Sequence, residues 1–152
     1  MSYITKTNPD EMTFGTSLQG YITATYAELV ELFGKPHDFF DDYKTDAEWY
    51  VEFDDGTVAT IYNWKNGRNY CGPDAPAVEN ITSWNVGGLT EAALDKVLEV
   101  STDYRLNIEF NSLSYAKRRM LLDHEKRHGE ALHNRIWSND PVDRVINDDL
   151  RD

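Results

Sequence analysis

The stretch from residue 47 to residue 64 constrains the fold most, because it has the pattern of a β-hairpin. Its first half alternates apolar with polar side chains, which predicts a strand with one buried face: Trp49, Val51 and Phe53 alternate with Glu48, Tyr50 and Glu52. Asp55-Gly56 can adopt the positive φ angles of a tight turn. The β-branched and aromatic run at 57–64 is typical of a second strand. Since a lone hairpin is only marginally stable in water, other elements must cover its aromatic face.

The helix expected at residues 26–33 has clear start and stop signals. Thr25 and Glu28 match a capping box, in which the threonine oxygen accepts from the amide three residues on. Gly34 ends the helix, and Pro36 prevents its continuation. Start and stop together enclose about two helical turns.

Further segments extend the hairpin into an α+β domain. The expected elements are strands at 17–24 and 81–86, a helix at 91–101 capped by Thr90, an irregular arm at 1–16, and loops at 37–46 and 68–76. The inward face of the 91–101 helix is predicted at Leu94, Val97, Leu98 and either Ser101 or Thr102. The predicted fold is an antiparallel sheet of about three to five strands with two packed helices and a helical C-terminal extension.

The extension begins near residue 101 and belongs to the same single domain as the 14–100 core. Alternation of Tyr104, Leu106, Ile108 and Phe110 predicts a strand. A helix is then expected from about residue 112 to 137, and Asp140-Pro141 opens a short final helix.

The net charge of −12 is unevenly distributed along the chain. Residues 113–137 carry six basic against three acidic residues, so the other residues together carry −15. Such a field disfavours nucleic-acid binding over most of the surface and favours encounter with a basic protein. Two plainer explanations stay open: the acidic charge serves solubility alone, and the basic segment is a solvated helix face rather than a phosphate contact.

Cysteine content and hydropathy indicate the compartment. The single cysteine, Cys71, cannot form an intramolecular disulfide, which fits a reducing cytoplasm. No apolar run approaches the ~18 residues that a membrane span needs, and residues 1–9 lack the apolar core of a signal peptide. We expect a soluble cytoplasmic protein.

Three segments together resemble a small domain encoded by many bacteriophages. They are Thr25-Tyr-Ala-Glu-Leu-Val-Glu-Leu-Phe-Gly-Lys-Pro36, the strand pair at 51–64, and Ile81-Thr-Ser-Trp-Asn-Val-Gly-Gly88. The resemblance covers about residues 14–100 and leaves 101–152 unmatched. It implies a phage accessory protein that acts inside a bacterial cell, and it brings no catalytic residues with it.

Residues 124–128 read His-Glu-Lys-Arg-His and match the H-E-x-x-H pattern. On a helix, histidines four residues apart share one face and can bind zinc, with the glutamate as general base and His133 or Glu130 as a third ligand. The two intervening cations and Gly129, which would loosen the geometry, argue against a metal. The alternative is an amphipathic basic helix, and we expect neither metal nor another cofactor.

Acidic residues crowd the segment 38–55, where a row of carboxylates can imitate nucleic-acid phosphates, spaced at one charge per ~1.7 Å of duplex. The residues predicted to bind a partner there are Asp38, Asp41, Asp42, Asp46, Glu48 and Glu52. The alternative is a solvent-facing strand whose charges discourage aggregation. Trp137 is the expected exposed anchor at a partner surface. Trp49, Trp64 and Trp84 are expected in the core or in cross-strand pairs.

These patterns favour a binding protein over an enzyme. We expect a phage accessory protein that binds a bacterial host protein, such as a defence or nucleic-acid enzyme, and inhibits or redirects it in the host cytoplasm. The acidic hairpin face and the 113–137 helix are the expected surfaces. Two alternatives stay open, a zinc-dependent hydrolase using residues 124–128 and a structural virion component. We expect no membrane contact and no direct binding to nucleic acid.

Overall fold

The structure of the protein is a computed structural model. It describes residues 1–7, 14–37 and 43–128. The chain divides into two compact units, Met1–Ser101 and Thr102–Asp152. The boundary falls inside a long helix, α3 (Ala92–Ser112).

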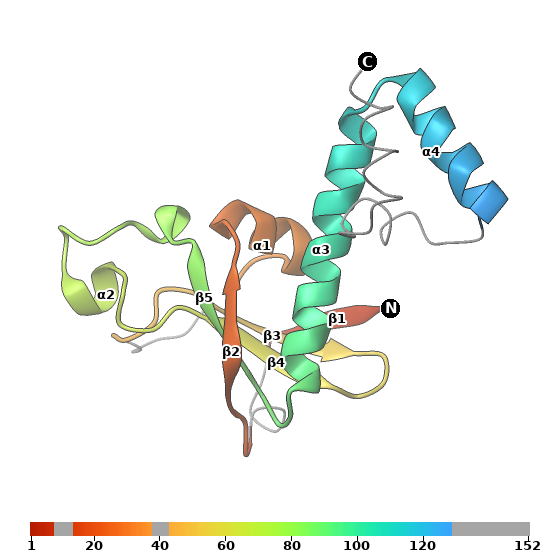
Figure 1. Cartoon of the computed structure of the whole chain (residues 1–152). Helices are drawn as coiled ribbons and strands as arrows, with labels where there is room; N and C mark the ends of the chain where they lie inside the picture. The colour runs from red at the N-terminus through yellow and green to blue at the C-terminus, as the bar shows by residue number, and fades with distance from the viewer. Residues whose placement is uncertain (8–13, 38–42, 129–152) are drawn as a thin grey trace. The chain divides into compact units, whose positions relative to one another are not determined.

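The first unit is built on a five-stranded antiparallel sheet (Figure 1). The strands are β1 (Tyr3–Lys6), β2 (Ser17–Thr23), β3 (Glu48–Phe53), β4 (Val58–Tyr62) and β5 (Ser83–Gly88). Their order across the sheet is β1-β3-β4-β5-β2. Together with the helices, this confirms the predicted α+β class.

The hairpin forms as predicted, except for its turn. β3 and β4 pair with Val51 opposite Ala59, and Trp49, Val51 and Phe53 are buried on one face. Gly56 has a φ of 86°, whereas the prediction of a positive φ at Asp55 is wrong. The Gly56 amide donates to the Phe53 carbonyl, so the connection is a wider turn that needs only one left-handed residue.

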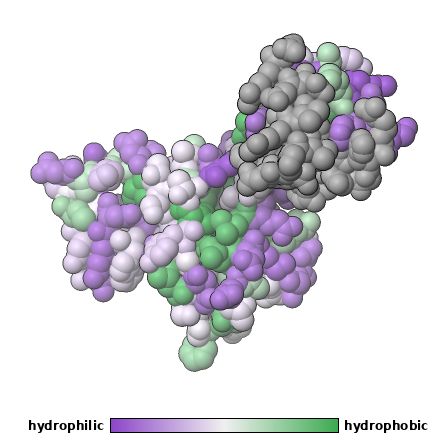
Figure 2. Space-filling view, in the orientation of Figure 1, coloured by the Kyte–Doolittle hydropathy of each residue, from purple (hydrophilic) through white to green (hydrophobic). Residues whose placement is uncertain are grey.

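The core lies between one face of the sheet and two helices, α1 (Tyr26–Phe33) and the first part of α3. Trp49 and Trp84 meet edge to face at its centre, with ring centroids 5.4 Å apart. Both rings are fully buried, and each indole N–H finds a backbone acceptor: Trp49 donates to Gly34 O and Trp84 to Ala24 O. Figure 2 shows apolar side chains near the middle of this unit and hydrophilic ones toward its edges.

The α1 helix begins and ends where its signals predict. Thr25 Oγ1 accepts a hydrogen bond from the Glu28 amide at 3.1 Å, which confirms the N-terminal cap. Gly34 follows the last turn with a φ of 78°, and its amide donates to Val30 O. Leu29 and Phe33 carry the buried face.

The prediction of an irregular arm at residues 1–16 is wrong at residues 3–6, which form the edge strand β1 against β3. Residues 8–13 of this arm lie outside the described residues. Tyr3 packs on Phe33 and Phe53, with ring centroids 5.3 and 5.8 Å away, and its hydroxyl donates to Leu32 O at 2.8 Å. Partial burial raises the pKa of this hydroxyl. A four-residue strand with one anchoring ring was too short to recognise from alternation.

Two short helical segments lie within the region after β4. Residues 68–76, predicted as a loop, begin with one helical turn, α2 (Arg68–Cys71), and a 3₁₀ turn, η1 (Val78–Asn80), precedes β5. The Arg68 Nε donates to Ala75 O at 3.1 Å, which closes the loop behind α2.

The predicted strand at 104–110 is wrong, because α3 continues without a break to Ser112. Thr90 Oγ1 accepts from the Ala92 amide as the helix begins. No glycine or proline interrupts the sequence from there to residue 112, and helix propagation is cooperative once a helix is nucleated. The predicted inward face is confirmed at Val97 and Ser101, which are buried, and wrong at Leu98, which is 42% exposed. Ala93 and Val100 are also buried.

The second unit contains the end of α3 and a further helix, α4 (Tyr115–His128). Ser114 caps α4 by accepting from the Lys117 amide, so the predicted helix starts three residues later than expected. Leu106 on α3 and Leu121 on α4 are buried. The predicted continuation of this helix to 137, and the final helix at 140, lie outside the described residues.

Candidate partner-binding site on the open face of the sheet

The face of the sheet opposite the core carries a hollow of about 240 Å³. Strand register explains its position. Tyr50 pairs with Thr60, Thr60 with Gly87, and Gly87 with Leu18, so these residues form one row across four strands. Small residues occupy the middle of the row and large ones its ends, which leaves a depression between Tyr50 and Leu18.

Gly87 keeps the floor of the hollow low. A Cβ atom at this position would lie 2.4 Å from Thr60 Oγ1 and 3.6 Å from the ring of Tyr62. Thr60 itself is only 6% exposed. A side chain at residue 87 would therefore have to displace the Thr60 hydroxyl, and glycine leaves this space open.

The wall beside this floor combines aromatic rings with one carboxylate. Glu48 pairs across the hairpin with Tyr62, and both line the hollow together with Trp64, which follows β4. The Tyr62 and Trp64 rings meet edge to face at 6.2 Å. Trp64 is 45% exposed, so its predicted place in the core is wrong. It also lies beyond the end of β4 at Tyr62, outside the cross-strand pairs of β3 and β4.

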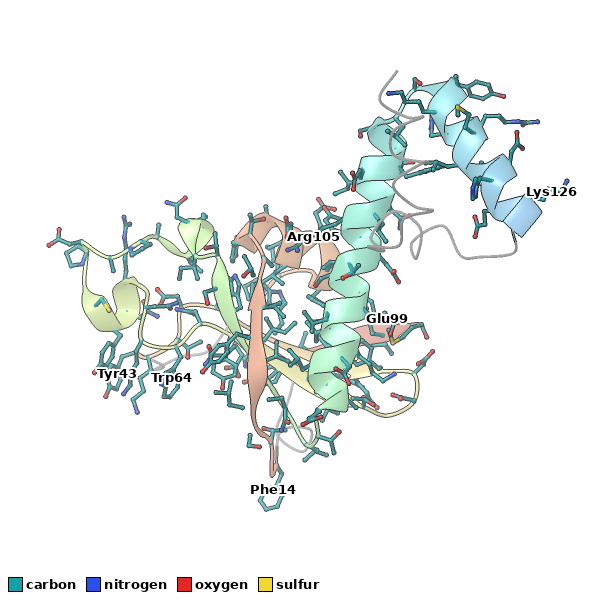
Figure 3. All side chains as sticks on the ribbon, in the orientation of Figure 1. Phe14, Tyr43, Trp64, Glu99, Arg105 and Lys126 are labelled. Atoms are coloured by element: carbon teal, nitrogen blue, oxygen red, sulfur yellow. The ribbon has the colours of Figure 1, made fainter. Side chains whose placement is uncertain are left out.

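Trp64 also belongs to an aromatic–lysine cluster, which we define as Tyr43, Lys44, Trp64, Lys65 and Tyr70. The Tyr43 and Tyr70 rings stack with centroids 5.7 Å apart. The ammonium groups of Lys44 and Lys65 lie 5.5 and 5.8 Å from the Trp64 centroid, within cation–π range. Figure 3 shows the Tyr43 and Trp64 side chains pointing away from α1.

A buried asparagine fixes the segment that leads into this site. Asn63 is fully buried; its Oδ1 accepts from the Asp46 and Ala47 amides at 2.7 and 3.0 Å. Its Nδ2 donates to Asp46 Oδ1 and Asn66 Oδ1, both at 3.0 Å. This network holds the start of β3 against the end of β4, so it positions Glu48 and Trp64 relative to each other.

The acidic residues predicted to bind a partner lie in different surroundings. Asp38, Asp41, Asp42 and Trp137 lie outside the described residues. Asp46 is half-buried and accepts from Asn63 and from the Asn69 amide, an internal role that the sequence did not indicate. Glu52 forms an ion pair with Lys6 at 3.0 Å. Glu48 is the member of the predicted set that lines the hollow.

The turn carboxylates Asp54 and Asp55 are engaged by neighbouring groups. The Ser2 amide donates to Asp54 Oδ2 at 3.2 Å, and this bond lowers the pKa of Asp54. The Thr57 amide donates to Asp55 Oδ1 at 2.9 Å, and Lys96 Nζ lies 3.0 Å from Asp55 Oδ2. Chiefly through the Thr57 amide, the pKa of Asp55 falls to about 2. These contacts spread the carboxylates over separate local partners.

The H-E-x-x-H stretch lies on α4, as its helical spacing requires. His124 and Glu125 are half-buried, whereas the His128 side chain, Glu130 and His133 are outside the described residues. Within residues 1–7, 14–37 and 43–128, no group of three or more His, Cys, Asp or Glu side chains is placed to hold a metal ion. The zinc hydrolase alternative stays a prediction.

Sequence reasoning identified Glu48 but missed the side chains around it. Tyr50 and Tyr62 appear in the sequence as members of alternating strands, and their outward direction follows once Trp49 and Ile61 are placed in the core. The row from Tyr50 to Leu18 could not be found in this way, because it depends on the order of the strands. The aromatic–lysine cluster did have a local signal in Trp64-Lys65 and Tyr43-Lys44.

Comparison with protein-family models, curated proteins and solved structures gave no match. In the part of the chain that the structure describes, none of the helices is both long and apolar enough to cross a membrane.

Proposed function

We propose that this protein is a phage accessory protein that binds a basic bacterial protein through the open face of its sheet and inhibits or redirects that protein in the host cytoplasm. The observation that carries the proposal is the hollow beside Glu48, because it places a carboxylate among aromatic side chains on an exposed face. Aromatic residues at such positions are enriched among the residues that dominate binding energy at protein interfaces.

The charge of the chain supports a protein partner over a nucleic acid. A net charge of −12 repels a polyphosphate over most of the surface and attracts a basic protein. The lysines of the aromatic–lysine cluster give only a local exception. A host enzyme that itself binds nucleic acid presents a positive surface that the net charge of this chain complements. Occupation of that surface would block the enzyme's substrate.

The resemblance of residues 14–100 to a phage-encoded domain supports the same proposal, since a phage accessory protein acts among host proteins. The matched segments include the strand pair at 51–64, which supplies Tyr62 and Trp64 to the hollow. Inhibition by docking requires no catalytic residues, and the proposal assigns none.

The test begins with affinity capture from a bacterial host lysate and continues with the purified partner. We expect a defined complex by size-exclusion chromatography. In ¹H–¹⁵N NMR spectra, the amides that shift on binding should lie on the open-face positions of β3 and β4 and in the aromatic–lysine cluster. Shifts confined to α1 and the exposed side of α3, or the absence of any protein that forms a complex after purification, would contradict the proposal.

A further inference from the structure

We infer that the hollow beside Glu48 receives a single arginine side chain of the partner protein. This inference rests on the proposed function and names the chemical group that the open face recognises. The volume of the hollow, about 240 Å³, is below the ~300–1,000 Å³ typical of sites for small-molecule ligands and cofactors. The space suits one long side chain better than a free metabolite.

The lining groups match a guanidinium group. Tyr50, Tyr62 and Trp64 offer aromatic surface, on which a flat guanidinium stacks favourably. Glu48 supplies a carboxylate, and carboxylate–guanidinium hydrogen bonds are charge-assisted and therefore strong. Ser17 and Thr60 belong to the same lining, and a hydroxyl oxygen can accept two hydrogen bonds. The Ser17 hydroxyl already accepts one of its two from Gln19 Nε2 at 3.2 Å.

Arginine fits this set of acceptors better than lysine does. A guanidinium presents five N–H donors in one plane, whereas an ammonium presents three donors around a point charge. A lining that combines one carboxylate with flat aromatic rings is better satisfied by the planar group. The net charge of −12 also favours the approach of a cationic partner.

The two lysines at Trp64 allow a cationic ligand to be distinguished from an anionic one, because removing a lysine charge should change the affinity for each in opposite directions. Lys44 and Lys65 already place positive charge within 5.8 Å of the Trp64 ring, so they oppose a second cation at that end. A cationic ligand should therefore bind better when Lys44 loses its charge. An anionic ligand, such as a nucleic-acid phosphate stacked on the same rings, should bind worse.

The experiment titrates the whole protein with Nα-acetyl-arginine amide and follows the Trp64 indole N–H by NMR, assigned from its loss in Trp64→Phe. We expect saturable binding in the millimolar range. The neutral isostere Nα-acetyl-citrulline amide should bind at least about tenfold more weakly, because it lacks the charge that strengthens a hydrogen bond. Unmoved indole signals of the buried Trp49 and Trp84 confirm that the core stays intact.

Matched variants complete the test. Glu48→Gln should weaken arginine-amide binding by roughly tenfold, Glu99→Gln on the exposed side of α3 should leave it unchanged, and Lys44→Met should tighten it. The inference is overturned by equal binding of the citrulline compound, by equal effects of the two glutamate variants, or by weaker binding to Lys44→Met. Saturable shifts with inorganic phosphate in place of arginine would assign the hollow to an anion instead.

Failure of the arginine pocket can be distinguished experimentally from failure of the proposed protein binding. A captured partner that binds wild type and Glu48→Gln with equal affinity overturns the arginine pocket and leaves protein binding intact. Arginine-amide binding that depends on Glu48, in a protein that captures no partner, supports the pocket and counts against the proposed function.

Discussion

Asn63 uses its whole hydrogen-bonding capacity inside the protein. Its Oδ1 accepts two hydrogen bonds, from the Asp46 and Ala47 amides. Its Nδ2 donates two, to the side chains of Asp46 and Asn66. Buried polar groups of this kind are stable only while every partner remains in place. The sequence shows a polar residue between Tyr62 and Trp64, but nothing local indicates that it is buried.

The substitution Asn63→Ala should lower the free energy of unfolding by about 3 kcal/mol, because the amides of Asp46 and Ala47 lose their acceptor. Asn66→Ala at an exposed neighbour removes one of the four bonds and should cost less than about 1 kcal/mol. Urea unfolding followed by tryptophan fluorescence measures both. Equal costs for the two variants would show that the network does not hold the segment.

Asp55 links pH to stability through the hairpin turn. Its pKa in the folded protein is about 2, against 3.8 for the unperturbed group. A folded-state pKa below the unfolded value stabilises the protein fully above 3.8, and the stabilisation disappears as the pH falls through about 2. In Asp55→Asn the Thr57 amide keeps an acceptor, but residue 55 no longer titrates.

The difference in unfolding free energy between wild type and Asp55→Asn should therefore shrink as the pH is lowered from above 3.8 toward about 2. Urea unfolding at constant ionic strength over this interval measures the difference. A difference that does not change across the interval would mean that the Thr57 and Lys96 contacts do not lower the pKa of Asp55.

Elements with strong local patterns were predictable, and elements defined by distant partners were not. The hairpin at 47–64, α1, β2 and β5 each have alternation or cap residues within their own sequence. β1 exists because β3 offers it an edge, and the pattern of its four residues is too short to identify. In α3, the apolar alternation from Tyr104 to Phe110 favoured a strand, but the continuous helix from Ala92 prevailed.

In the candidate site, the position of Glu48 could be predicted from the sequence, whereas the hollow could not. Glu48 could be placed on the outward face because the strand alternates. The hollow itself depends on Gly87 lying beside Thr60, a pairing between strands more than twenty residues apart. No local pattern contains that register.

The substitution Tyr3→Ala tests whether β1 is an integral strand. It removes the ring from Phe33 and Phe53 and should lower the free energy of unfolding by about 3 kcal/mol, as for other large aromatic truncations. Tyr3→Phe removes only the hydroxyl bond to Leu32 O and should cost about 1 kcal/mol. Thermal or urea unfolding gives both values, and a negligible loss in Tyr3→Ala would indicate that residues 3–6 are not a stable part of the sheet.

For the whole molecule, charge is the property most relevant to association. The net charge of −12 favours encounter with a basic partner at long range, and salt weakens that attraction. Long-range attraction alone does not select a face. In the proposed function, selection of the open face comes from short-range contacts between the partner and Glu48 with the aromatic rings around it.

Calorimetric titration of the purified partner with two charge-reversal variants tests this claim most directly. Glu48→Lys and Glu99→Lys change the net charge equally, but Glu48 lines the hollow and Glu99 lies exposed on α3 (Figure 3). We predict that Glu48→Lys weakens binding at least about tenfold, while Glu99→Lys changes the Kd by no more than about twofold. Equal weakening by both variants would contradict the account, because binding would then depend on total charge and not on the open face.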